Sequence, residues 1–137
     1  MNKILITCLL WLGLSLNVQA EEMFELSDQC KEDVMNMIKC KVADDVSADD
    51  AVDSMKLRAN FLNFKLGGHM PFAEQVAAMG GKSDRMEIFQ FCDAMIAAQM
   101  VKHSMAFAGY LPCRISLVVD DKGQAWLITL NMDTTMG

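Results

Sequence analysis

The clearest pattern of hydrophobic and polar positions lies in the C-terminal half of the chain. An apolar run of strand length, 86–92, precedes 93–110, where Ala and Met recur at helical density. Two further apolar runs, 111–119 and 124–131, flank the sequence Asp-Asp-Lys-Gly, which is typical of a hairpin turn. This half of the chain therefore predicts strand, helix, strand, tight turn and strand.

The N-terminal half predicts a strand followed by a helix. Apolar and polar residues alternate over about 34–42, which indicates a first strand. Ser47 opens a sequence that resembles a capping box, so a helix is expected to begin there. Its apolar residues then fall on one face: Val52, Met55, Ala59 and Leu62.

A second strand and a short helix complete the pattern. The apolar run 61–66 predicts the strand, and the glycine pair at 67–68 is expected to end it. Pro71 fits the first turn of a helix over 72–79, which should stop at the glycine pair 80–81.

The order β-α-β, short helix, β-α-β-β predicts an α+β protein. We expect one two-layer α/β sandwich, in which a mixed sheet carries its helices on one face. If the strand ending at Cys92 and the strand beginning at Cys113 are parallel, the helix between them crosses the sheet and separates the sulfur atoms. On that topology a Cys92–Cys113 disulfide is excluded.

Residues 1–20 have the organisation of an export signal. Lys3 supplies the positive start, an apolar centre follows, and Val18 and Ala20 precede the expected cut. The apolar run is short for a membrane span, and the acidic Glu21-Glu22 is no stop-transfer flank. We therefore expect a single domain over 21–137, periplasmic or secreted, with no stable membrane anchor.

The charge balance restricts the partners. The chain has 12 basic and 18 acidic residues, a net charge of −6. An acidic chain is poorly suited to nucleic acid or to an anionic membrane surface. We therefore expect no nucleic-acid partner and no binding to an anionic membrane surface.

Several short sequences resemble the domain-of-unknown-function 302 family, especially its exported, cysteine-bearing branch. They are EIFQFCD at 87–93, LPCRI at 111–115, and Trp126-Leu127 with NMD at 131–133, while the helix opening at 47–52 also matches. The resemblance covers about residues 34–133. It implies a small α/β domain, commonly paired as a homodimer, and no assigned activity.

Cys92 is the first candidate for chemistry. It ends a predicted strand and precedes the cap-like Asp93, so its sulfur should lie near a helix N-terminus, where the dipole lowers a thiol pKa. The negative charge of Asp93 acts in the opposite direction. The alternative interpretation of Cys92 is a packed core cysteine.

Cys113 and Arg114 stand together at the start of a predicted strand. Arg114 would lower the thiol pKa of Cys113 if the two side chains met. Successive strand residues point to opposite faces, however. The pattern therefore favours a packed Cys113 and an Arg114 that anchors an acidic partner or a helix end.

The remaining cysteines, Cys30 and Cys40, invite pairing in an oxidising compartment. Four cysteines allow three connectivities. Cys30 could pair with Cys40 or with either of the other two, and the sequence leaves the connectivity open.

A metal site would use sulfur and imidazole donors. His69 and Met70 follow a glycine pair, and His103 lies on the long predicted helix. Thioether and thiolate ligands select Cu(I) or haem iron. Methionine is ordinarily a core residue, however, and covalent c-type haem is excluded because the chain has no Cys-x-x-Cys-His sequence.

The sequence favours a small exported binding module. In this hypothesis Cys92, with a nearby Met or His, holds a thiophilic ligand such as haem, a soft metal or a sulfur compound. Cys113 and Arg114 are the further candidate ligand-binding residues. A thiol-based redox or sulfur-carrier protein that uses Cys92 is the first alternative, and it needs an activating group that the sequence does not show. A structural or interaction dimer without ligand is the second alternative.

Export predicts a mature chain that begins at Glu21, because Val18 and Ala20 occupy the small-residue positions before the cut. N-terminal sequencing of exported protein checks this expectation. A chain that starts at Met1, or one with lipid on Cys8, would contradict it.

Overall fold

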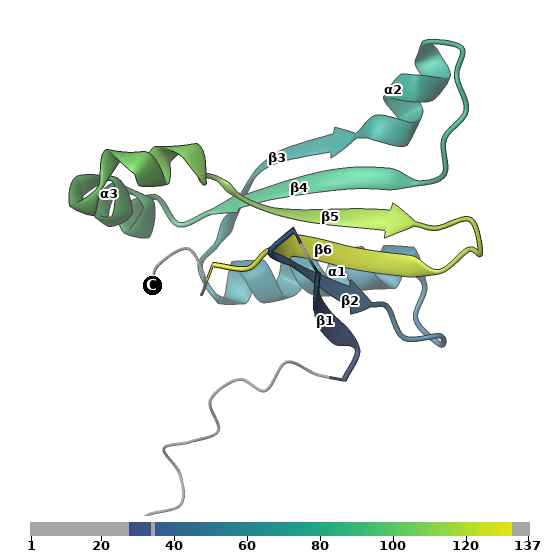
Figure 1. The fold of residues 1–137 in the computed structure, drawn as a ribbon, viewed down its shortest axis with the longest axis horizontal. Helices are drawn as coiled ribbons and strands as arrows, with labels where there is room; N and C mark the ends of the chain where they lie inside the picture. The colour runs from purple at the N-terminus through teal and green to yellow at the C-terminus, as the bar shows by residue number, and fades with distance from the viewer. Residues whose placement is uncertain (1–27, 34, 133–137) are drawn as a thin grey trace, which may run out of the picture.

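The computed structural model describes residues 28–33 and 35–132; the expected export signal lies outside them. The strands are β1 (Cys30–Asp33), β2 (Met37–Lys41), β3 (Lys65–Pro71), β4 (Met86–Cys92), β5 (Cys113–Val119) and β6 (Ala125–Leu130). The helices are α1 (Ala48–Phe61), α2 (Phe72–Ala78), α3 (Ala94–His103) and the 3-10 turn η1 (Met105–Gly109). The strands form one sheet in the order β1-β2-β6-β5-β4-β3 (Figure 1).

Helix α1 forms the second layer of the fold. Ser47 caps it, because its Oγ accepts a hydrogen bond of 3.0 Å from the amide of Asp50. Ala51 and Val52 are buried against the sheet, where Phe89 and Leu117 are fully buried. Figure 1 shows α1 behind the sheet and α2 and α3 beyond its two ends. The predicted α+β class with two layers is therefore confirmed.

The expected core face of α1 is right except at its end. Val52, Met55 and Ala59 belong to the core, but Leu62 is 48% exposed. Leu62 follows the last helical residue, and Asn63 then turns the chain with a φ of 63°. Phe64 packs against the core in its place.

Three predicted features of the C-terminal half are confirmed. Strand β4 has the expected bounds, α3 begins directly after its cap Asp93, and β5 and β6 form a hairpin. In the turn, Gly123 has a φ of 79°, which favours glycine. The Oδ1 atom of Asp120 accepts hydrogen bonds of 3.0 Å and 2.9 Å from the amides of Lys122 and Gln124.

The first predicted strand, 34–42, is wrong in extent. The range contains only one strand, β2, which forms a hairpin with the preceding β1, and Asn36 turns the chain between them with a φ of 59°. The alternating pattern belongs to β2 alone. Strand β1 forms the edge of the sheet, and the Cys30–Cys40 disulfide joins it to the residue directly opposite in β2.

The predicted strand at 61–66 is also wrong. Phe61 is the last residue of α1, and β3 begins only at Lys65, so the glycine pair lies inside the strand. The pairing with β4 shifts between Leu66 and Gly68, which marks a bulge. A Cβ atom on Gly68 would lie 2.6 Å from Oε1 of Gln90, so a larger residue here would displace the end of the flexible Gln90 side chain. The short helix α2 begins after Pro71, as expected.

The prediction of a mixed sheet is wrong, because every strand pair is antiparallel. Strands β4 and β5 are neighbours, with Phe91 opposite Cys113. The helix between them does not cross the sheet. Helix α3 ends at Ser104, whose backbone is extended and whose Oγ accepts a hydrogen bond from the amide of Ala106, and η1 brings the chain back. Of the three helices, only α1 packs into the core.

Removal of the Cys30–Cys40 disulfide should destabilise the folded chain. A cross-link between residues that are ten apart in sequence contributes about 2–3 kcal/mol through the smaller entropy of the unfolded chain. Urea titration of the oxidised protein and of the C30A/C40A variant measures this difference. Equal midpoints, or peptide maps with Cys30 and Cys40 as free thiols, would contradict the assignment.

Candidate functional site

Cys92 and Cys113 lie at the same end of two adjacent strands. Cys92 ends β4, Cys113 begins β5, and both thiols are free and half-buried. The expected absence of a bond between them is therefore confirmed, but the reason given for it is wrong. The helix does not separate them; the alternation of side chains does. Cys113 shares a face with its partner Phe91, whereas Cys92 points to the other face of the sheet.

The face that carries Cys92 is opposite α1. Figure 1 shows no described helix across it. Residues directly opposite in an antiparallel pair share a face, so the pairing defines its members. Its centre is half-buried and mainly apolar: it consists of Met86, Ile88, Val118, Trp126, Ile128 and Leu130, with the polar Ser116 between Ile88 and Ile128. We call this surface the open face.

Arg114 is a neighbour of Cys92 on the open face. It pairs with Gln90, which is two residues before Cys92 on the same side of β4. Diagonal neighbours of this kind are within reach of a long side chain. As the alternation along the predicted strand indicated, Arg114 lies on the face opposite Cys113, which is the face of Cys92. The Arg114 side chain is exposed and available to an acidic group.

Cys113 is suited to packing. Burial raises the pKa of its thiol, and the nearby Cys92 raises it further, while hydrogen bonding to its own backbone and the charge of Arg114 lower it to a smaller extent. Cys113 therefore remains a protonated, weakly nucleophilic thiol at neutral pH. This agrees with the packed role that the sequence favoured.

Asp93 already occupies the N-terminus of α3. Its Oδ1 atom accepts hydrogen bonds of 2.9 Å from the amide of Met95 and 3.1 Å from that of Ile96, and Asn63 donates to Oδ2 at 3.1 Å. The bond from Ile96 is the largest of the effects that lower the Asp93 pKa. The negative charge of Asp93 therefore compensates the helix dipole next to Cys92.

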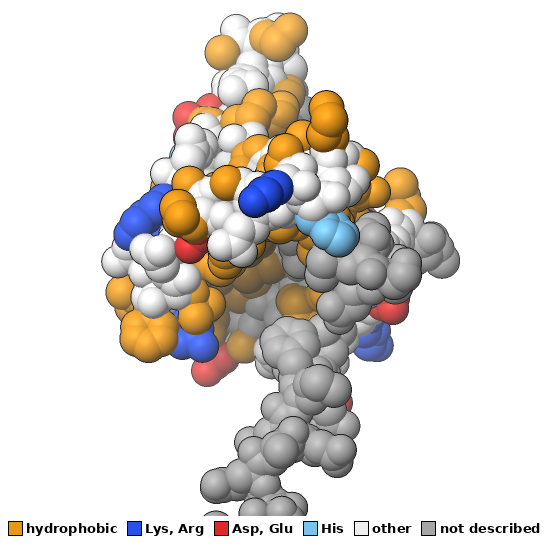
Figure 2. Space-filling view, turned by 90° about the vertical axis from the view of Figure 1, so that its left-hand side faces the viewer, with side chains coloured by type: hydrophobic (Ala, Val, Ile, Leu, Met, Phe, Trp, Pro, Cys, Tyr) orange, Lys and Arg blue, Asp and Glu red, His pale blue; other side chains and the backbone are white. Residues whose placement is uncertain are grey.

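The end of the sheet that carries both thiols is rich in exposed apolar side chains. Figure 2 views the molecule from this end and shows a hollow among hydrophobic side chains. The exposed apolar residues of α1, β3, α3 and η1 include Leu57, Phe61, Leu66, Met95, Ile96 and Met105. Leu66, which is opposite Phe91, and the α1 residues lie on the side of the sheet that carries Cys113. The apolar surface beside Cys92 is therefore that of the open face.

The candidate metal ligands are not gathered at one place. His69 lies in the middle of β3, where Nε2 is 2.6 Å from Oε2 of Glu87 and the ring stacks on Phe89. Met70 is on the open face, opposite Ile88, and His103 ends α3. Within residues 28–33 and 35–132, no three His, Cys, Asp or Glu side chains are placed to hold a metal ion.

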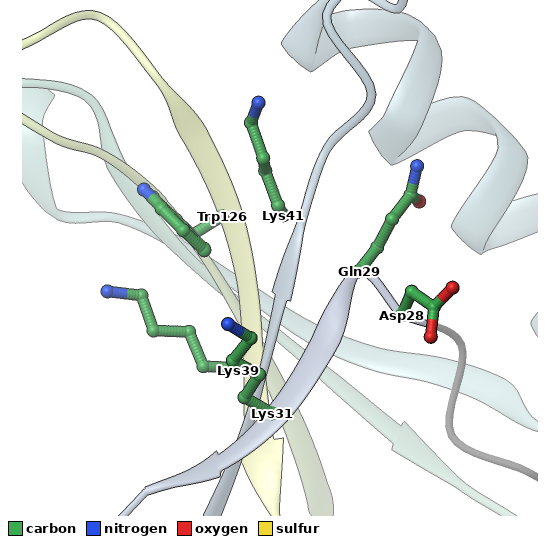
Figure 3. A pocket seen from close by; sticks show the side chains of 6 residues that line it. All are labelled: Asp28, Gln29, Lys31, Lys39, Lys41 and Trp126. Carbon is green, nitrogen blue, oxygen red and sulfur yellow. The ribbon is translucent and has the colours of Figure 1, made fainter.

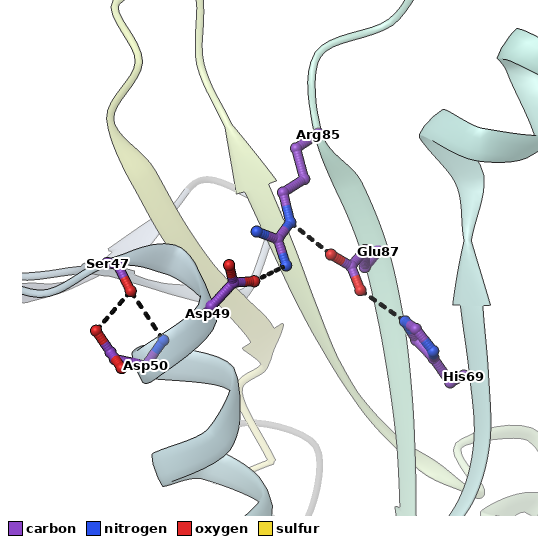
Figure 4. A network of polar contacts seen from close by, with 6 residues as sticks. All are labelled: Ser47, Asp49, Asp50, His69, Arg85 and Glu87. Atoms are coloured by element: carbon purple, nitrogen blue, oxygen red, sulfur yellow. Dashed lines mark hydrogen bonds and ion pairs between the residues drawn. The ribbon is translucent and has the colours of Figure 1, made fainter.

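A polar network on the α1 side was not predicted from the sequence (Figure 4). Arg85 donates from Nε to Oε1 of Glu87 at 2.6 Å and forms an ion pair of 2.8 Å with Asp49 of α1. Burial raises the pKa of Glu87, but the hydrogen bonds of Arg85 and His69 outweigh it and lower the pKa overall. The signal for this network in the sequence was Glu87, a charged residue inside the apolar run of β4. The network joins α1, β4 and β3.

Comparison with known proteins gives the family. The model of the family described as "Domain of unknown function DUF302" matches residues 38–137. The chain belongs to the DUF302 family. No curated protein matches it. A solved structure of an uncharacterized conserved DUF302 protein from Bacillus stearothermophilus is 15% identical, with a TM-score of 0.67 over 75% of this chain and 79% of that one. This likeness shows the DUF302 fold.

Glu87→Gln should destabilise the protein by about 1–2 kcal/mol at neutral pH, because the contacts with Arg85 and His69 lose their anionic partner. The Glu87 pKa is lowered in the folded state. Its stabilisation is therefore present above the ordinary carboxyl pKa and is lost as pH falls through the lowered value.

Urea titrations at several pH values measure this effect, with Glu74→Gln on the exposed side of α2 as the control. The difference between wild type and Glu87→Gln should shrink in acid. A difference that stays constant with pH would contradict the role of the Glu87 charge.

Proposed function

We propose that this DUF302 protein is an exported binding module that holds a thiophilic ligand through Cys92. The observation that supports this most is the position of Cys92 on the open face, where no described helix covers it. Its thiol is half-buried, so a ligand can reach it while apolar side chains exclude part of the water.

Arg114 gives the ligand a second point of attachment. A guanidinium binds carboxylates in a bidentate geometry, and Arg114 is on the same face as Cys92. A ligand with a soft acceptor, an apolar body and an acidic group matches these neighbours. Haem has this chemistry, with iron for a cysteine thiolate and propionates for an arginine. A soft metal ion or a sulfur compound would use Cys92 alone.

In the alternative, the protein is a redox protein or sulfur carrier that uses the same thiol. Such chemistry needs a group that activates Cys92. His69 is engaged with Glu87 on the other face of the sheet, and Asp93 is engaged with the start of α3. These contacts favour binding over catalysis.

Export to the periplasm or the cell exterior is part of the proposal. The Cys30–Cys40 disulfide supports it, since structural disulfides persist in oxidising compartments. Residues 1–20 have the pattern of a signal. None of the described helices is long and apolar enough to cross a membrane.

The open face also supports the second alternative, a homodimer without ligand, in which a second copy of the chain covers this face in place of a ligand. A sheet that is apolar on both faces is stable in water when each face is covered, and α1 covers one. A second copy would bury Ile88, Val118 and Ile128 on both chains. Equilibrium sedimentation tests this proposal, and Val118→Lys should weaken association at least about tenfold. A wild-type protein that is monomeric at about 100 μM would contradict it.

Cys92→Ala should abolish binding of a thiophilic ligand, whereas Cys113→Ala should preserve it, because Cys113 faces α1. Titration with hemin, followed by its absorbance, and with Cu(I) in competition with a chelator test this directly. Wild-type protein should bind at least one of the two with 1:1 stoichiometry. Arg114→Gln should weaken hemin and leave Cu(I) unchanged.

Other outcomes would overturn the proposal. Loss of the ligand in Cys113→Ala with retention in Cys92→Ala would move the site to the α1 side. Intact mass of native protein with a persulfide or mixed disulfide on Cys92 and no bound hemin or Cu(I) would favour the sulfur-carrier alternative.

A further inference from the structure

A second candidate binding site lies on the open face, at the end of the sheet away from Cys92. It is a groove of about 340 Å³, which is within the size range of small-ligand pockets. Its lining comes from β1, β2, β6 and the residues before β1, namely Asp28, Gln29, Lys31, Lys39, Lys41 and Trp126 (Figure 3). Trp126 pairs with Val118 near the end of β5, whereas Cys92 lies beside the start of β5.

In the absence of a ligand, two of the lysines, Lys31 and Lys39, form a pair of like charges. Lys31 and Lys39 are directly opposite each other in the β1–β2 pairing, so both side chains point to the open face. Like charges in directly opposite positions destabilise a sheet. Among the described residues, neither ammonium group has an ion-pair partner, whereas Lys41 pairs with Asp44 at 2.7 Å. In a chain with a net charge of −6, this local excess of positive charge is the opposite of the average.

Trp126 gives the groove a fixed aromatic wall. Its Nε1 donates a hydrogen bond of 2.9 Å to Asp120, which holds the indole ring in place and engages the Asp120 carboxylate. The Nζ atom of Lys39 lies 4.2 Å from the ring centroid, in a cation–π contact. The lysine stems add apolar surface beside the ring. Asp28 is the one acidic residue in the lining, before the start of β1.

We propose that this groove binds a small, flat organic anion of the aromatic carboxylate class. The carboxylate lies between the ammonium groups of Lys31 and Lys39 and relieves their repulsion. The ring lies along Trp126 and the lysine stems. This site is separate from the thiol site in position and in chemistry, because it uses charge and aromatic surface and contains no sulfur donor.

The Cys30–Cys40 disulfide supports the groove. It joins the cross-strand pair next to Lys31 and Lys39, so it holds the edge strand β1 in register with β2. Without it, the four-residue strand β1 would lose the link that keeps Lys31 opposite Lys39. The C30A/C40A variant should therefore bind the anion more weakly than the oxidised wild type.

Calorimetric titration of the exported protein with 2-naphthoate tests the proposal. Lys39→Gln should lower the affinity at least about tenfold, since a charge-assisted contact is lost, and added salt should weaken binding. Lys82→Gln, an exposed lysine between α2 and β4, is the matched control and should bind like wild type. The neutral analogue 2-naphthalenemethanol should bind at least about tenfold more weakly than 2-naphthoate.

A second measurement separates loss of a binding group from loss of fold. Lys31→Gln removes the like-charge pair and keeps the contact of Lys39 with Trp126, so its melting temperature should equal or exceed that of wild type while its affinity for 2-naphthoate falls. Cys92→Ala should leave 2-naphthoate binding unchanged, which distinguishes this site from the proposed thiol site. Equal affinity of Lys39→Gln and wild type, equal binding of the neutral analogue, or no saturable binding up to about 1 mM would overturn the proposal.

Discussion

The antiparallel pairing of β4 with β5 is the constraint on which the rest of the structure depends. It places Phe89 and Leu117, the two fully buried side chains, on one face of the sheet at its centre. Helix α1 packs there because Ala51 and Val52 complete the same core. A shift of one residue in this pairing would move these side chains to the solvent face. The register is therefore fixed by burial.

The same register decides what the chemistry-bearing residues can do. With Phe91 opposite Cys113, the two free thiols occupy one end of the sheet but opposite faces. Cys113 becomes part of the α1 side, while Cys92 and Arg114 belong to the open face. On the other edge of the sheet, the pairing of β1 with β2 places Lys31 opposite Lys39 and next to a disulfide. Both proposed sites therefore follow from cross-strand neighbours that are far apart in sequence.

Local signals in the sequence were enough for the elements that depend on local physics. Ser47 and Asp93 cap the helices that they were expected to cap, and Gly123 lies in the predicted hairpin turn. The strand predicted at 61–66 failed because Phe61 and Leu62 are apolar but exposed at the end of α1. An apolar run of that length does not distinguish a strand from a helix end.

Features that depend on contacts between distant segments could not be predicted from the sequence pattern. The helix length between Cys92 and Cys113 suggested a crossover between parallel strands, and the break at Ser104, which returns the chain to the next strand, carries only a weak local signal. The network of Asp49, Arg85, Glu87 and His69 joins three elements, so no single segment reveals it. The contact of Trp126 with Lys39 likewise depends on the pairing of β2 with β6.

The central claim is that Cys92 lies on the open face and Cys113 on the face that α1 covers. The rates at which a charged thiol reagent modifies native Cys92→Ala and Cys113→Ala proteins, measured at dilute concentration, test it most directly. The account predicts that Cys92, the thiol left in Cys113→Ala, reacts at least about ten times faster than Cys113, because burial on the α1 side limits access to Cys113 and raises the pKa of its thiol. Equal rates, or faster modification of Cys113, would contradict the assignment of the two thiols to opposite faces.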